Sequence, residues 1–149
     1  MRILIDGDGF PDVKKVIDIA KKYNISIIVY MDFNHEFYDD YAIIKFISPG
    51  NNAVDLEIQN QVIVNDLVLT NDYGVAVIAL SKNTRCLNSN GFEYSNDNID
   101  SLLERRYMNM KLRRTCNVKG PKKRTTNDTL KLLNSIENVI LESKNEKKF

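Results

Sequence analysis

Two short acidic motifs in this chain each follow an apolar segment. Asp6-Gly7-Asp8-Gly9 comes directly after residues 3–5 (ILI), and Asn71-Asp72 comes directly after residues 67–70 (LVLT). Ligands of open parallel sheets usually bind where the strands end. Carboxylates gathered at such an edge repel one another unless a cation, a proton or a ligand group neutralises them. Because hard divalent cations prefer oxygen ligands, the two motifs predict a metal site.

A third segment adds Asp55, which lies close to the start of a predicted helix that follows another strand. Two-metal phosphodiester hydrolysis needs a cluster of carboxylates, with one ion activating water and another stabilising the leaving oxygen. We therefore predict that Asp6, Asp8, Asp55 and Asp72 are catalytic and metal-binding, with Mg²⁺ or Mn²⁺ as the cofactor. The alternative is that each aspartate caps a helix or fixes a turn. Gly7 and Gly9 leave room for close backbone approach to a ligand.

The elements that must position these residues can be read from the hydrophobic pattern. Strands are predicted at 2–5, 26–30, 41–47 and 66–70, and a hairpin at 85–94 around an Asn-Gly turn. Helices are predicted after Pro11-Asp12, with the apolar stripe Val13, Val16, Ile17 and Ala20; after Asn52 as a cap; and at 73–80, 98–110 and 126–142. The last helix is expected to begin at Thr126 and to bury Leu130, Leu133, Ile136 and Ile140, after a loop at 115–125.

The alternation of strands and helices predicts an α/β fold in a single domain. We expect a mostly parallel sheet flanked by helices, with a small hairpin and C-terminal helices. The domain is expected to span 1–142, with 143–149 as a disordered tail. The two cysteines form no metal or disulfide framework, and no apolar run approaches the roughly 20 residues of a membrane span. With no signal-peptide pattern at the N-terminus, a cytoplasmic protein without membrane contact is expected.

The net charge of +1 hides a strong asymmetry along the chain. Residues 1–104 hold 8 lysines and arginines against 16 acidic residues, whereas residues 105–124 hold 9 basic residues and no acidic one. Such a stretch can hold the phosphates of a nucleic acid, or it can be a solvated basic face. The predicted nucleic-acid-binding residues are Arg106, Arg113, Arg114, Lys122, Lys123 and Arg124. No base-reading motif and no sign of an oligomeric state can be read from the sequence.

Several of these motifs together resemble the YaiI/YqxD family of uncharacterised bacterial proteins. The resemblance rests on residues 5–11 (IDGDGFP), 50–55 (GNNAVD), 66–72 (DLVLTND) and Gly120-Pro121, and it covers about residues 1–140. It implies a PIN-like nuclease fold, in whose relatives acids at the strand ends bind magnesium or manganese and cleave RNA. By that analogy the acidic positions are the four aspartates named above. Phe10 and Asn52 depart from the family pattern, which commonly has a cysteine and an aspartate there.

These observations lead to three functional expectations. The first is a metal-dependent nuclease, acting on RNA, with phosphates held by the basic stretch. The second is a non-catalytic nucleic-acid-binding module, whose binding would be salt-sensitive and need no metal. The third is a phosphatase of the haloacid-dehalogenase type, in which Asp6 would attack phosphate and Asp8 would act as acid and base. Phe10 stands where that third class usually has a threonine.

Overall fold

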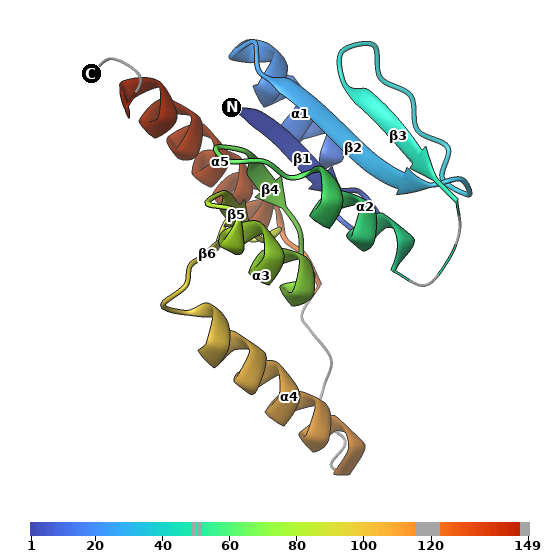
Figure 1. The fold of residues 1–149 in the computed structure, drawn as a ribbon, viewed down its shortest axis with the longest axis vertical. Coiled ribbons are helices and arrows are strands. Elements are labelled where there is room, and N and C mark those ends of the chain that lie inside the picture. Colours follow the sequence, from blue (N-terminus) through green and yellow to red (C-terminus); the bar gives the residue numbers. More distant parts are fainter. Residues whose placement is uncertain (49, 51, 116–122, 147–149) are drawn as a thin grey trace.

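The computed structural model describes residues 1–48, 50, 52–115 and 123–146, with the backbone alone at 113–115 and 146. At its centre lies a six-stranded sheet in the order β3-β2-β1-β4-β5-β6 (Figure 1). The strands are β1 (Arg2–Asp6), β2 (Ser26–Asp32), β3 (Ile43–Ile47), β4 (Leu67–Leu69), β5 (Arg85–Leu87) and β6 (Glu93–Tyr94). All neighbours pair in parallel except β5 and β6, which form the antiparallel hairpin. The predicted α/β fold class is confirmed.

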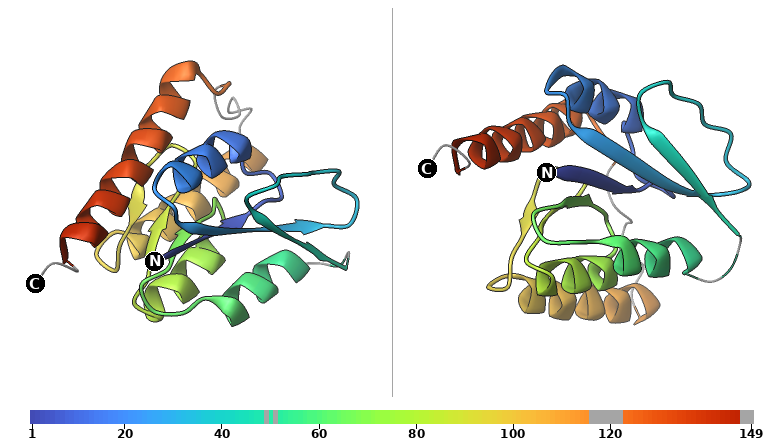
Figure 2. Two further views of the ribbon diagram at one scale, coloured as in Figure 1. Left: turned by 90° about the horizontal axis from the view of Figure 1, so that it is seen from above. Right: turned by 45° about the horizontal axis from the view of Figure 1, so that its top comes forward.

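Helices cover both faces of the sheet (Figure 2). Helices α1 (Val13–Lys22) and α5 (Thr126–Glu146) pack on one face, and α2 (Ala53–Gln61) and α3 (Tyr73–Ser81) pack on the other. Successive strand residues point to opposite faces, so Ile3 and Ile5 lie in the first core and Leu4 lies in the second. Because both faces are buried, the central strands are continuous apolar runs rather than alternating ones.

The starts of the helices differ in how their free N–H groups are satisfied. The carboxylate of Asp72 caps α3 by accepting a hydrogen bond of 3.1 Å from the backbone N–H of Val75. Asn52, predicted to cap α2 with its side chain, makes no such bond and adopts a left-handed backbone conformation, with φ 61°. Asparagine is one of the few residues that tolerate this conformation, so Asn52 has a backbone role at the start of α2.

The C-terminal helix corrects two details of the prediction. Its side-chain cap is Thr125, one residue before the predicted Thr126, because Thr125 and Asp128 bond each other's backbone N–H groups. The buried stripe is Thr129, Leu132, Ile136, Val139 and Ile140, whereas Leu130 is 52% exposed. The predictions for Ile136 and Ile140 are confirmed, and Leu133 packs partly buried against the same core, but Leu132 faces inward in place of Leu130. The helix also continues to Glu146, beyond the predicted end at Glu142.

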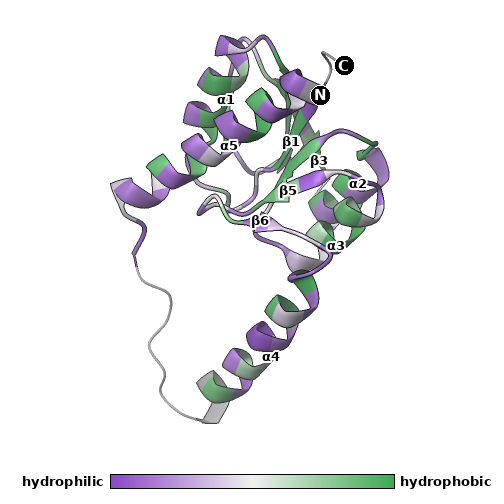
Figure 3. Cartoon of the chain, turned by 90° about the vertical axis from the view of Figure 1, so that its left-hand side faces the viewer, coloured by the Kyte–Doolittle hydropathy of each residue, from purple (hydrophilic) through white to green (hydrophobic). Residues whose placement is uncertain are grey.

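Helix α4 (Ile99–Thr115) extends away from the sheet (Figures 1 and 3). Of the described residues of α4, only those of the first turn join the hydrophobic core: Ile99 is buried and Leu102 contacts the core beneath α2 and α3. Residues 103–112 are all exposed. The helix ends five residues later than predicted, and most of the predicted loop after it, residues 116–122, lies outside the described residues. No described helix, α4 included, combines the length and the apolar character needed to cross a membrane.

A candidate acidic pocket at the ends of the parallel strands

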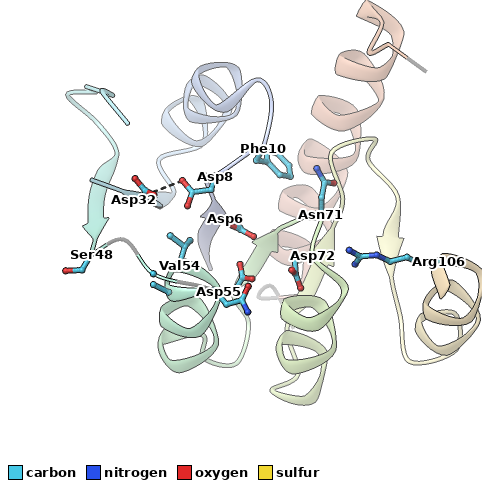
Figure 4. Close-up of a pocket in the computed structure, with 13 residues that line it drawn as sticks. Asp6, Asp8, Phe10, Asp32, Ser48, Val54, Asp55, Asn71, Asp72 and Arg106 are labelled. Carbon is cyan, nitrogen blue, oxygen red and sulfur yellow. Dashed lines mark hydrogen bonds between the residues drawn. The ribbon is translucent and has the colours of Figure 1, made fainter. Parts of the chain in front are cut away.

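All four predicted aspartates line one pocket at the carboxyl ends of β1 and β4 (Figure 4). The pairing of Ile5 with Leu69 puts the ends of these two strands side by side, so Asp6 and the Thr70–Asp72 segment meet there. Asp55 reaches the pocket from the first turn of α2. The pocket has a volume of about 380 Å³. Its other lining residues are Phe10, Asp32, Ser48, Gly50, Asn52, Ala53, Val54, Asn71 and Arg106.

Asp6 is the most enclosed of these carboxylates, at 7% exposed. The hydroxyl of Thr70 donates a hydrogen bond of 3.0 Å to Asp6 Oδ2 and stabilises its charged form. Burial and the charge of Asp55 act in the opposite direction and prevail, raising the pKa of Asp6 to about 7. A carboxyl group with this pKa is partly protonated at neutral pH unless a cation takes the place of the proton.

Asp55 and Asp72 complete the inner group. Burial and the charge of Asp72 raise the pKa of Asp55, as burial and the charge of Asp55 raise that of Asp6. The Asp72 carboxylate is held by the hydrogen bond that it accepts from the Val75 N–H at the start of α3. The backbone of Gly74 also lies so close that a Cβ at this position would be 3.0 Å from Asp72 Oδ1. The start of α3 therefore fixes Asp72 in place.

Asp8 lies farther out, beside β2. Its carboxylate accepts a hydrogen bond of 3.3 Å from the Asp32 backbone N–H, and its Oδ1 lies 2.8 Å from His35 Nδ1. Neither Asp32 nor His35 was predicted as a site residue. Asp32 could have been found, because it ends the strand next to β1, but the sequence analysis ended that strand at residue 30. The contact of His35 depends on the path of the loop after β2 and has no signal in the sequence.

Local structure explains why glycine stands at positions 7 and 9. The Gly7 N–H donates to the carbonyl of Tyr30 at 2.9 Å, and a Cβ at Gly7 would lie 2.7 Å from that same oxygen. The space at Gly7 is thus filled by β2. Gly9 has a φ of +79° and open space around it, so it serves the turn that leads into α1.

Arg106 is the only basic residue among the described residues that line the acidic pocket. It reaches the pocket from α4, and its guanidinium carbon lies 5.2 Å from the centre of the Tyr73 ring. Figure 4 shows Arg106 directed from α4 toward Asp72. This predicted phosphate-binding residue therefore lies beside the predicted metal-binding residues.

The other predicted basic residues do not gather at the pocket. Arg124 bonds three partners on other elements: Asp12 Oδ2 at 3.0 Å, Asn90 Oδ1 at 3.2 Å and the Ser89 carbonyl at 2.8 Å. These bonds join the segment before α5 to the start of α1 and to the β5–β6 turn. Lys123 lines a separate surface pocket with Arg124. Arg113 and Arg114 lie on the last turn of α4 with their side chains outside the description, and Lys122 is outside the described residues.

The carboxylate oxygens of the four aspartates are the candidate ligands of a metal ion. Within the part of the chain that the structure describes, no three His, Cys, Asp or Glu side chains are grouped as ligands of one ion. The four aspartates share a pocket, and their charges help to raise the pKa of Asp6 and of Asp55, but as positioned they do not form a ready-made coordination shell. The oxygen chemistry of the group suits Mg²⁺ or Mn²⁺, whereas the arrangement of the oxygens does not yet fit them.

Comparisons with known proteins identify a family. A family model described as the uncharacterised YaiI/YqxD family matches residues 4–142. A UPF0178 protein of Alkaliphilus oremlandii is 41% identical over 114 residues, covering 76% of this chain and 74% of its own. UPF0178 proteins of Clostridium novyi and Clostridium kluyveri are 37% and 39% identical, each covering 97% of this chain and 97% and 95% of their own. No solved structure matches. The chain therefore belongs to the YaiI/YqxD family of uncharacterised bacterial proteins.

Proposed function

We propose that this protein is a divalent-metal-dependent nuclease that hydrolyses phosphodiester bonds of RNA at the acidic pocket. One observation carries the proposal: Asp6, Asp55 and Asp72 come from three separate elements into one pocket, where the pKa of Asp6 is raised to about 7. Carboxylates that share a pocket repel one another, which opposes folding unless something binds between them. A divalent cation would neutralise two charges at once.

The residues proposed to hold the cation are the inner aspartates, with Asp8 at the outer edge. Because they are not grouped as ligands among the described residues, the proposal requires that metal binding draws their oxygens together on the ion. A bound cation would activate water and stabilise charge on the phosphate. Arg106 supplies a fixed positive charge at the same pocket and would orient the phosphate.

A non-catalytic nucleic-acid-binding module remains the second candidate, and the absence of a grouped ligand set among the described residues favours it. The two candidates differ in whether a divalent metal is required. The haloacid-dehalogenase reading has less support, because Asp6 is buried, its pKa is raised, and no lysine lines the pocket among the described residues. An enclosed carboxyl group that is partly protonated at neutral pH is a weaker nucleophile than an exposed carboxylate.

The test is cleavage of a labelled single-stranded RNA with Mn²⁺, with Mg²⁺ and with EDTA. Asp55→Asn and Asp72→Asn are expected to lower the metal-dependent rate about 100-fold or more, since metal ions contribute several kcal/mol to such transition states. Asp18→Asn is the matched control, because Asp18 is an exposed aspartate on α1. Equal cleavage by all four proteins, or cleavage that persists in EDTA, would reject the proposal. RNA binding without any cleavage would select the binding module.

A further inference from the structure

A second groove adjoins the acidic pocket, between the start of α3 and the exposed face of α4. It is lined by Tyr73, Leu102, Arg105, Arg106, Asn109 and Met110 and has a volume of about 390 Å³. Arg106 lines both the groove and the acidic pocket, and Tyr73 follows directly after Asp72 in the chain. The two sites are therefore neighbours.

We propose that this groove binds one nucleotide of a single-stranded nucleic acid, the nucleotide next to the phosphate that occupies the acidic pocket. The inference rests on the proposed function, because that function places a phosphate in the pocket. It adds the substrate class, single-stranded rather than duplex, and names the residues that select it.

The aromatic surface of the groove is fixed in position. The Tyr73 ring packs edge-on against Tyr94, with ring centres 5.6 Å apart and planes at 69°. Tyr94 in turn contacts Phe92 in the same manner at 6.1 Å. Since Tyr94 is only 3% exposed, it anchors Tyr73 to the core. The Arg106 guanidinium lies over the Tyr73 ring, so the pair presents a stacking surface for a base.

The polar side of the groove suits a sugar-phosphate backbone. Neither Arg105 nor Arg106 forms an ion pair with an acidic side chain of the described residues. Two unpaired guanidinium groups next to each other can bind phosphate oxygens in bidentate fashion. Asn109 adds an amide that can donate and accept hydrogen bonds with a base edge.

A base must leave its neighbours to enter this groove. In a duplex this requires unpairing and unstacking, whereas the bases of a single strand are already free to turn outward. The groove therefore favours single strands. Stacking on aromatic and arginine side chains is tolerant of sequence, so little base preference is expected.

The test is binding of a fluorescent 12-nucleotide RNA, measured by anisotropy in EDTA, where no metal-dependent cleavage contributes. Met110→Glu places a charge in the groove, and Met108→Glu places the same charge two residues away on the exposed part of α4, outside the groove. Met110→Glu is expected to weaken binding about tenfold and Met108→Glu about twofold or less. The duplex form of the RNA is expected to bind more weakly than the single strand.

A second pair of variants separates groove binding from general electrostatics. Arg105→Ala and Lys111→Ala each remove one positive charge from α4, but only Arg105 lines the groove. The proposal predicts about a fivefold or larger loss of RNA affinity for Arg105→Ala alone.

A third pair of variants tests stacking. Tyr73→Phe should keep the RNA affinity and Tyr73→Leu should lower it, with circular dichroism confirming that both variants fold.

The outcomes distinguish this inference from the proposed function. Single-strand binding that depends on the groove, with no cleavage by the wild type in Mn²⁺, would support the groove and reject the nuclease. Metal-dependent cleavage with equal binding by the Met110→Glu and Met108→Glu variants would support the nuclease and overturn the groove. A dimer in solution that Met110→Glu disrupts would also overturn it, because the groove would then be a contact between two copies of the chain.

Discussion

The hydroxyl of Thr70 donates to Asp6 and at the same time accepts a hydrogen bond from the backbone N–H of Asp72, both at 3.0 Å. One buried side chain at the end of β4 thus connects two of the pocket carboxylates. It sets the distance between β1 and the start of α3 at the point where the acidic pocket forms.

Replacing Thr70 with valine is expected to destabilise the fold by about 1–3 kcal/mol. The change keeps the shape but leaves the Asp6 carboxylate and the Asp72 N–H without this partner. Urea unfolding measures the loss. Thr70→Ser keeps the hydroxyl and is expected to cost less. A serine variant as unstable as the valine variant would show that the methyl group, not the hydrogen bonds, is what matters.

The stability of the metal-free protein is expected to fall as the pH rises from about 4 to about 7. Asp6 has a pKa of about 7 in the folded protein against an ordinary value of 3.8, so in this range the folded state binds more protons than the unfolded state. Stability therefore decreases with pH, by on the order of 3 kcal/mol for this one group. Asp6→Asn is expected to remove most of that slope, as judged by urea unfolding at pH 5 and pH 7.5.

The control for this pH series is Asp18→Asn, which should keep the slope of the wild type. The lowered pKa values of Asp12 and Asp39 affect stability only below pH 4, so they do not disturb the measurement. A wild-type stability that stays level or rises between pH 5 and pH 7.5 would contradict the account of Asp6.

Divalent metal is expected to raise the melting temperature, and more so at pH 7.5 than at pH 5.5, because the cation competes with protons for the same carboxylates. At a metal concentration of 100 times the dissociation constant, binding adds about 2.7 kcal/mol. Asp55→Asn should reduce the rise, and NaCl of equal ionic strength should not reproduce it. The same melting temperature with and without millimolar Mn²⁺ would argue against a specific site.

Arg124 is expected to stabilise the folded protein. Its guanidinium bonds Asp12, Asn90 and the Ser89 carbonyl, and Asp12 also accepts a hydrogen bond of 2.8 Å from Thr129. Burial acts to raise the pKa of Asp12, but the hydrogen bonds from Thr129 and Arg124 outweigh it and lower the pKa. Arg124→Met should therefore cost about 2–4 kcal/mol. Lys123→Met is the matched control and should leave stability nearly unchanged in thermal unfolding.

A role of Arg124 in RNA binding remains a separate prediction. If Arg124 holds phosphate as the sequence analysis predicted, its variant should bind RNA more weakly than the Lys123→Met variant under conditions in which both are folded. Equal RNA affinity of the two variants would leave Arg124 with its structural role alone.

Local rules were enough for the sheet and for the position of the acidic residues. Asp6 and Asp72 each follow a buried apolar strand, and parallel strands bring their carboxyl ends to one edge, so two residues 66 positions apart could be placed together. The apolar stripe of α1 was equally predictable, because Val13, Val16, Ile17 and Ala20 follow the helical period.

Other features depend on contacts between distant segments and have no local pattern. The bond from Arg124 to Asp12 joins residues 112 positions apart, so nothing in the sequence distinguishes Arg124 from the other cations of the basic stretch. In α5, Leu130 and Leu132 are both leucines, and only packing on α1 decides that Leu132 faces inward. Asn52 was read as a side-chain cap, although its tolerance of positive φ explains its position.

The most direct test of the metal site is a crystal of this protein soaked in Mn²⁺ and measured at the manganese absorption edge. The account predicts an anomalous peak in the acidic pocket, with oxygens of at least two of Asp6, Asp55 and Asp72 at about 2.0–2.3 Å, the range for small hard cations. A crystal of the Asp55→Asn variant, soaked in the same way, should show a weaker anomalous peak. A pocket without anomalous signal at saturating Mn²⁺, with the three carboxylates still apart, would contradict the account.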